Sequence, residues 1–251
     1  MLSRSWLTVS GIPPAVEEDR PDEDRRRLDA AVKAGDSPFA AYLVSPWSKH
    51  LARFAARRGW TPDGVTLLSF AIGVGAAAAF AAGSRGGMIA GAVLLQASFA
   101  TDCVDGQLAR YTGNFSGFGA WLDTGCDRAK EYLVYAGLAL GSTHGFDDDV
   151  WLLAACALAL QAIRHTADFA WVAFRPAGGG LPLSTSRWMQ PVNQLIRLPI
   201  AERFALISLT AAVASPRVTF IALLVWGGLG AAFALAVRVG LSFTIRPAGA
   251  R

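Results

Sequence analysis

Four aspartates stand out because the sequence around them is largely apolar. Asp102 and Asp105 are three residues apart, and Asp123 and Asp127 are four residues apart. Side chains at these spacings share one face of a helix. A carboxylate at the centre of a bilayer costs about 2.5–3.5 kcal/mol, so this cluster needs a compensating partner. Carboxylates that converge form a hard oxygen site and predict Mg²⁺ or Mn²⁺, with two ions because each carboxylate can bridge.

Small residues and an arginine accompany the aspartates. Gly106 and Ala109 follow the first pair, and Gly119 lies one turn before the second pair. A helix face without large side chains lets a diphosphate or a substrate backbone approach closely. Arg110 presents a planar fork that suits phosphate. Metal ions and an arginine beside a glycine-lined face indicate phosphoryl transfer.

The elements that position these residues are predicted to lie in a membrane. Of the 251 residues, 53% are hydrophobic and only 17% are charged. A soluble domain usually carries about 25% charged residues, so the composition excludes a disordered chain and argues against an ordinary soluble enzyme. The net charge of +4 is too small to suggest a nucleic-acid partner. Apolar blocks of this length predict an all-α integral membrane protein with several spans.

Six transmembrane helices are expected, separated by breaks rich in glycine, proline and polar residues. The short turn at Thr112-Gly113-Asn114 makes the second and third spans antiparallel neighbours. Both aspartate pairs should then lie at similar depth and face each other. The spans are predicted near 63–83, 86–110, 117–142, 149–174, 199–214 and 217–244.

An amphipathic juxtamembrane helix is predicted before the first span. Lys49, Arg53 and Arg57 recur every four residues on one face, while Trp47 and Leu51 share another. This pattern is typical of a helix in the membrane interface, although an ordinary surface helix is the alternative. The expected division is a cytosolic tail at 1–36 with a short helix around 25–33, the interfacial helix at 37–58, the membrane domain at 59–245 and a cytosolic tail at 246–251.

Loop charges predict the orientation in the cell membrane. Basic residues gather in the N-terminal region, in the 110–117 loop, in the loop from Arg175 to Leu198 and at the C-terminus. The loop that contains Asp147, Asp148 and Asp149 is acidic and should lie outside. Positively charged loops stay in the cytoplasm, so both termini and the aspartate site are expected there.

The segment from Asp102 to Asp127 resembles the signature of the CDP-alcohol phosphotransferases, also called CDP-alcohol phosphatidyltransferases. That signature reads D-x2-D-G-x2-A-R-x8-G-x3-D-x3-D, and all eight defining positions match at the expected spacing. Residues 61–66, Thr-Pro-Asp-Gly-Val-Thr, also resemble the family's T-P-N-x-[IV]-T motif, except that Asp63 replaces the asparagine. The resemblance covers about residues 45–245.

The resemblance implies a six-helix membrane fold, usually a homodimer, with an active site open to the cytosol. It implies that Asp102, Asp105 and Asp123 coordinate the metals. Asp127 would lie near or on the metals and act as the general base that takes the proton of the acceptor hydroxyl. The implied reaction moves a phosphate-bearing alcohol from a CDP-alcohol to a second alcohol and releases CMP. The residues implied at the CDP site are Gly106, Ala109, Arg110 and Gly119, with Thr61, Pro62 and Thr66 from the second motif.

Recognition of the acceptor is predicted from basic residues outside the motif. Arg128, Lys130 and Arg164 are the residues expected to touch an acceptor phosphate. Arg187 and Arg197 are further candidates, for which anchoring of a cytosolic loop is the alternative. Asp168 lies four residues after Arg164 and is a candidate ion-pair partner for it.

The predicted function is metal-dependent phosphatidyl transfer from CDP-diacylglycerol to a polar, possibly phosphorylated, alcohol in phospholipid biosynthesis. One alternative is the same chemistry with a soluble CDP-polyol such as CDP-inositol. An alternative of another class is a carboxylate-lined cation transporter, which predicts helices broken near the membrane midplane. Purely structural aspartates and an inactive scaffold are further alternatives, and the complete motif argues against both. The motifs leave open the donor, the acceptor, the metal, the role of the tail and membership of a larger protein.

Overall fold

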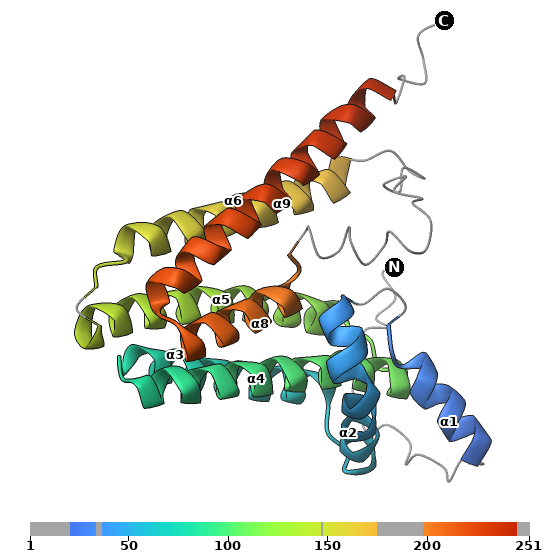
Figure 1. The fold of residues 1–251 in the computed structure, drawn as a ribbon. Coiled ribbons are helices and arrows are strands. Elements are labelled where there is room, and N and C mark those ends of the chain that lie inside the picture. Colours follow the sequence, from blue (N-terminus) through green and yellow to red (C-terminus); the bar gives the residue numbers. More distant parts are fainter. Residues whose placement is uncertain (1–20, 34–36, 147, 175–197, 245–251) are drawn as a thin grey trace, which may run out of the picture.

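The computed structural model describes residues 21–33, 37–146, 148–174 and 198–244, and these form a helical bundle (Figure 1). Two short helices come first, α1 (Pro21–Ala30) and the π-helical turn η1 (Ala40–Val44), followed by α2 (Ser45–Arg57). The predicted loop with Arg175, Arg187 and Arg197 lies outside the described residues, as does Asp147. The longer helices are α3 (Pro62–Ala81), α4 (Arg85–Thr112), α5 (Gly117–Gly145), α6 (Trp151–Phe174), α8 (Ile200–Val213) and α9 (Pro216–Thr244).

These six longer helices begin and end within three residues of the predicted spans. Three of them, α3, α4 and α9, contain stretches long and apolar enough to cross a membrane. Helix α8 has 14 residues and is about 21 Å long, less than the ~30 Å of a hydrocarbon core. The predicted all-α fold is therefore confirmed for the described residues, with three helices that could cross a membrane, and six crossings stay a prediction.

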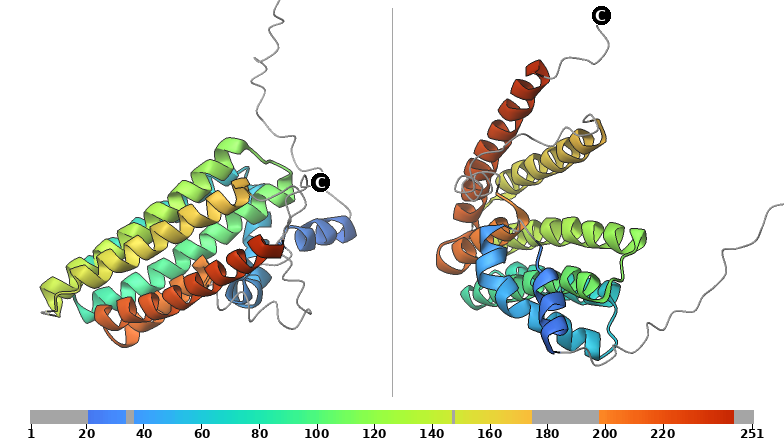
Figure 2. Two further views of the ribbon diagram at one scale, coloured as in Figure 1. Left: turned by 90° about the horizontal axis from the view of Figure 1, so that it is seen from above. Right: turned by 90° about the vertical axis from the view of Figure 1, so that its right-hand side faces the viewer.

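The helices are arranged so that their turns gather at two ends of the bundle. The turns α3–α4, α5–α6 and α8–α9 lie at the left of Figure 1, and α1, α2 and the α4–α5 turn lie at the right. Helix α3 packs against α4 and α5, α4 packs against α8, and α9 packs against α6 and α8. Figure 2 shows the long helices running alongside one another, with α1 and α2 across one end.

Hydroxyl side chains start three of the helices. The hydroxyls of Thr61, Ser84 and Ser116 each accept a hydrogen bond from the backbone N–H three residues later, at 3.2, 2.9 and 2.7 Å. These bonds satisfy donors that a helix N-terminus leaves unpaired. Helix α4 ends at Gly113, whose φ of +69° favours glycine. The turn between the two aspartate-bearing helices is thus fixed by local sequence at both of its ends.

Helix α5 approaches α3 so closely that their backbones touch. Gly137, Gly141 and Gly145 recur every four residues on α5, and a Cβ atom on any of them would overlap backbone atoms of α3 or of the turn after it. Stripes of small residues allow this approach between membrane helices. Helix α4 also packs against α3, so α3 lies against both of the helices that carry the aspartates.

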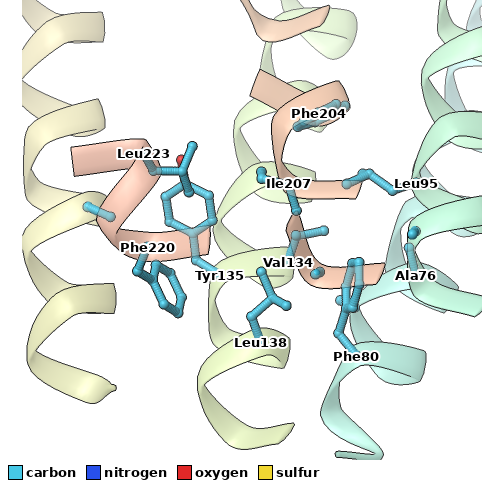
Figure 3. Close-up of a cluster of buried hydrophobic side chains, with 14 of the residues drawn as sticks. Ala76, Phe80, Leu95, Val134, Tyr135, Leu138, Phe204, Ile207, Phe220 and Leu223 are labelled. Carbon is cyan, nitrogen blue, oxygen red and sulfur yellow. The ribbon is translucent and has the colours of Figure 1, made fainter. Parts of the chain in front are cut away.

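The apolar core fills the space between these helices (Figure 3). Phe80, Leu95, Leu138 and Phe204 are fully buried and come from four different helices. The ring of Tyr135 meets Phe220 edge to face, with centroids 5.9 Å apart. The interior therefore links the first three long helices to α8 and α9.

Candidate active site

Three of the four predicted metal ligands converge between α4 and α5. One carboxylate oxygen from each of Asp102, Asp123 and Asp127 lies within 4.8 Å of the others. Oxygens at this separation can share a divalent cation, which takes carboxylate ligands at about 2.0–2.6 Å. Helices α4 and α5 run unbroken through the aspartates, unlike the interrupted helices that the transporter alternative predicts.

Asp105 lies on the same face of α4 but has a different environment. It is 6% exposed, and its Oδ2 accepts a hydrogen bond from Thr66 Oγ1 at 2.6 Å. Thr66 is itself buried and belongs to the second motif of the sequence. The two motifs therefore meet at this bond, which orients the Asp105 carboxylate.

Lys130 occupies a position that sequence reasoning did not foresee. Its Nζ lies 2.5 Å from Asp102 Oδ1, 3.0 Å from Asp127 Oδ1 and 2.8 Å from the hydroxyl of Ser69. The side chain is 0% exposed, and its stem runs against Gly73, where a Cβ would lie 2.8 Å from the lysine Cγ. Lys130 was predicted to touch an acceptor phosphate, but the structure turns it toward the carboxylates instead.

A cavity of about 260 Å³ adjoins the aspartates on the side of the second motif. Gly119 lines it at a close approach, because a Cβ there would lie 2.7 Å from Asp63 Oδ1. Asp63, the residue that departs from the family motif, is thus part of this wall. Thr61 caps α3 beside the cavity and is not among its lining residues. The other predicted CDP-site residues in the wall are Pro62, Thr66, Gly106, Ala109 and Arg110.

A larger cavity of about 380 Å³ adjoins the first one along α4. The two cavities share Asp105, Gly106, Arg110 and Asp123. Arg110 lies over Gly106, where a Cβ would be 3.3 Å from a guanidinium nitrogen. The remaining walls of the larger cavity include Lys33, Ser37, Phe99, Asp102, Gln107 and residues 199–201.

Two other predicted acceptor residues lie among buried polar groups between α5 and α6. Arg128 Nη1 is 2.8 Å from His165 Nε2, and Arg164 Nη1 donates to Gln161 Oε1 at 3.1 Å. Neither arginine lines the two described cavities. Asp168, predicted as a partner of Arg164, forms an ion pair with Arg238 of α9.

A second buried ion pair lies next to Lys130 and was also missed. Glu131 is 0% exposed and accepts two hydrogen bonds from Arg203 of α8, at 2.8 and 3.1 Å. Gln161 and Tyr135 donate to the same carboxylate at 2.9 and 3.0 Å. The sequence did contain a signal for this ion pair. Glu131 and Arg203 are charged residues within apolar segments, and such residues need partners.

Comparison with known proteins identifies relatives of the whole bundle. The profile of the CDP-alcohol phosphatidyltransferase family matches residues 60–238. The chain is 30% identical over 169 residues to a phosphatidylinositol phosphate synthase of Streptomyces avermitilis, covering 67% of this chain and 62% of that protein. It is 36% identical over 129 residues to one of Mycolicibacterium smegmatis, covering 50% and 56%. The matches thus span less than two thirds of the length of these curated relatives.

Solved structures share the fold. The phosphatidylinositol phosphate synthase of Mycobacterium tuberculosis with CDP-DAG bound has a TM-score of 0.58 at 24% identity, covering 81% of this chain and 97% of that one. The same enzyme in complex with manganese and citrate has a TM-score of 0.54 at 26% identity, covering 76% and 88%. The helical architecture is therefore that of an enzyme already solved with a divalent metal.

Proposed function

Because the chain belongs to the CDP-alcohol phosphatidyltransferase family, we propose that it transfers a phosphatidyl group from CDP-diacylglycerol to a phosphorylated polyol, with release of CMP. The convergence of the Asp102, Asp123 and Asp127 carboxylates between two cavities carries this proposal. Several relatives are named phosphatidylinositol phosphate synthase, which favours inositol phosphate as the acceptor.

Asp102, Asp123 and Asp127 have the chemistry to hold divalent cations, and Asp105 stands beside them on a hydrogen bond from Thr66. We assign Mg²⁺ or Mn²⁺ to this site, with two ions, and the manganese complex of a relative supports a divalent metal. Such ions neutralise a diphosphate and stabilise the CMP leaving group. In their absence, Lys130 partly balances the same carboxylates.

The two cavities suit the two substrates. The smaller cavity is lined by the glycine, alanine and arginine of the signature, and we assign it to the CDP moiety. The larger cavity shares Gly106 and Arg110 with the smaller one but contains no residue of the second motif, and we assign it to the acceptor. Arg128 contacts His165, Lys130 contacts Asp102 and Asp127, and Arg164 contacts Gln161. Because their side chains are engaged by these groups, we do not assign the three residues to acceptor binding.

Asp127 is the proposed general base. Its carboxylate belongs to the convergent group and pairs with Lys130. It would take the proton of the acceptor hydroxyl while the new P–O bond forms at the phosphatidyl phosphorus and the bond to CMP breaks. A carboxylate beside cations keeps a strong preference for the charged form, so this base would act by position more than by basicity.

The membrane setting completes the proposal. We infer that six helices cross the cell membrane, that the α1–α2 end and both termini are cytoplasmic, and that the enzyme is a homodimer in phospholipid biosynthesis. The basic loops support the orientation, because positive residues stay on the cytoplasmic side. Access from the cytoplasm would suit a polar acceptor.

CMP release by the purified protein in nanodiscs tests the proposal. CDP-diacylglycerol and CDP-inositol are each crossed with glycerol phosphate, inositol phosphate, inositol and serine, with Mn²⁺, with Mg²⁺ and with chelator. We expect metal-dependent release with CDP-diacylglycerol and a phosphorylated acceptor. CMP release with CDP-inositol but not with CDP-diacylglycerol would show that the donor is the soluble CDP-polyol. If CDP does not bind with any metal, the phosphotransferase proposal is wrong and cation flux becomes the test.

A further inference from the structure

Helix α1 precedes the residues that the family profile matches, yet it is docked on the helices of the site. Asp24 accepts a hydrogen bond from Tyr111 of α4 at 2.5 Å and pairs with Arg53 of α2 at 3.0 Å. Asp29 pairs with Lys49 of α2 at 2.7 Å. Leu28 and Ala31 are buried beneath these contacts, at 4% and 1% exposure. The segment is therefore held by the apolar side chains of Leu28 and Ala31 and by the polar contacts of Asp24 and Asp29.

The docked segment reaches the active site through its C-terminal end. The carbonyl of Ala31 accepts a hydrogen bond from Arg110 Nε at 2.5 Å, and Arg110 belongs to both cavities. Two residues later, Lys33 lines the larger cavity together with Asp102 and Asp123. The residues that follow α1 thus bind Arg110 through a backbone carbonyl and place Lys33 in the lining of the larger cavity.

Charge distinguishes the two cavities. Lys33 and Arg110 are the basic side chains among the described residues that line the larger cavity, whereas Arg110 stands alone in that role in the smaller one. Lys33 has no hydrogen bond or ion pair among the parts of the chain that the structure describes. An ammonium that shares a cavity lining with a guanidinium, beside carboxylates that can hold divalent cations, is suited to a phosphate group.

We propose that Lys33 is a substrate-binding residue that contacts a phosphate group in the larger cavity, and that the docking of α1 positions it. This inference rests on the proposed function for the identity of the ligand. The phosphate belongs either to the acceptor or to the donor diphosphate. Because Lys33 lines only the cavity that contains no residue of the second motif, the structure favours the acceptor phosphate.

The test compares Lys33→Ala with Arg26→Ala, an exposed residue of α1 that lines neither cavity. We expect Lys33→Ala to raise the KM for the phosphorylated acceptor about ten- to a hundredfold, as for the loss of a charged hydrogen bond. The kcat and the KM for CDP-diacylglycerol should change little, and Lys33→Arg should restore most of the affinity. A rise in the KM for the donor instead would assign the phosphate to the donor.

Calorimetric binding to the Mn²⁺-loaded protein separates this inference from the proposed function. Inositol 1-phosphate, glycerol 3-phosphate and inorganic phosphate serve as probes, and binding requires no turnover. Weaker binding to Lys33→Ala than to Arg26→Ala supports the inference even if CMP release fails. Equal effects of the two variants, unchanged constants in Lys33→Ala, or no binding of any probe to the wild type would overturn it.

A double-mutant cycle tests the positioning by α1. Asp24→Ala removes the contacts of that carboxylate with Tyr111 and Arg53. We expect it to weaken phosphate binding, as Lys33→Ala does. The double variant should bind about as weakly as Lys33→Ala alone, because the two changes act through one contact. Fully additive effects would show that α1 docking does not position Lys33.

Discussion

Lys130 and Glu131 are neighbours on α5 and are both fully buried, but the charges around them are balanced differently. Glu131 meets one guanidinium, that of Arg203, and its carboxylate also receives hydrogen bonds from Gln161 and Tyr135. Lys130 is the single cation within ion-pair distance of Asp102 and Asp127 among the described residues, and Asp123 belongs to the same group.

The difference separates a structural cluster from a functional one. A buried pair in which each charge is matched holds helices together and is costly to break on one side only. A group of three carboxylates with one lysine keeps an excess of negative charge, and this excess is what a divalent cation would neutralise. Unbalanced charge in the bundle therefore marks the active site, more than burial or the number of ionisable groups does.

The largest effect is expected at Asp127, in the unbalanced group. Asp127→Asn should lower turnover by about 10²- to 10⁴-fold, the usual contribution of a general base, and leave CDP-alcohol binding largely intact. The measurements are single-turnover CMP release and nucleotide binding. Asp105→Asn is the matched comparison, because it should weaken metal-dependent nucleotide binding as well. Normal turnover in Asp127→Asn would remove the base assignment.

A substitution in the balanced group, which is Glu131 with Arg203, should change the free energy of unfolding. Glu131→Ala leaves Arg203 buried without its partner, so we expect a loss of about 3–5 kcal/mol in unfolding free energy. Thermal or denaturant unfolding in detergent measures it. Asp102→Asn, in the unbalanced group, should cost the metal-free protein much less, because it relieves repulsion between carboxylates. Equal losses in the two variants would contradict the distinction between the clusters.

Lys130→Met sharpens the comparison by removing the one cation from the unbalanced group. We expect the metal-free protein to be less stable and Mn²⁺ to bind roughly tenfold more tightly, because the lysine no longer competes for the carboxylates. The shift of the unfolding midpoint with Mn²⁺ concentration reports both effects. Weaker Mn²⁺ binding would show that Lys130 instead preorganises the ligands.

The smallest effect concerns pH and the docking of α1. The hydrogen bond from Tyr111, with help from the Arg53 charge, lowers the pKa of Asp24 below its usual value. A lowered pKa in the folded state stabilises docking above the unfolded value near 3.9, and this contribution disappears as the pH falls through the folded value. The hydrogen-exchange protection factors of α1, which correct for the intrinsic pH dependence of exchange, should therefore fall below about pH 4. Asp24→Asn should show low protection factors that no longer depend on pH in this range.

Sequence patterns predicted the parts of the fold that depend on local information. Helix boundaries followed from long apolar blocks and from breaks such as Thr112-Gly113-Asn114, and the three- and four-residue spacings predicted which aspartates share a helix face. The partners of Lys130 and Glu131 were not predictable in this way. Glu131 and Arg203 are 72 residues apart, and only the tertiary fold brings them together.

Lys33 illustrates the same limit for the candidate site. Its contribution to a cavity wall depends on the docking of α1 through Asp24 and Asp29, contacts that span 20 to 87 residues of sequence. A run of mixed charge such as that around α1 is typical of a solvated tail. Its complementarity to particular residues of α2 and α4 becomes visible only when the helices are placed in space.

The glycine contacts between α5 and α3 fix the position of α5 along its axis, and with it the position of the aspartates of α5. An axial slip of α5 by one residue is about 1.5 Å, and such a slip would carry its backbone into the carbonyls of α3. Gly137 lies ten residues, or roughly 15 Å, from Asp127. The spacing of the carboxylates therefore depends on backbone contacts roughly 15 Å away along α5, and a single methyl group added at Gly141 would shift the proposed metal ligands without altering any charge.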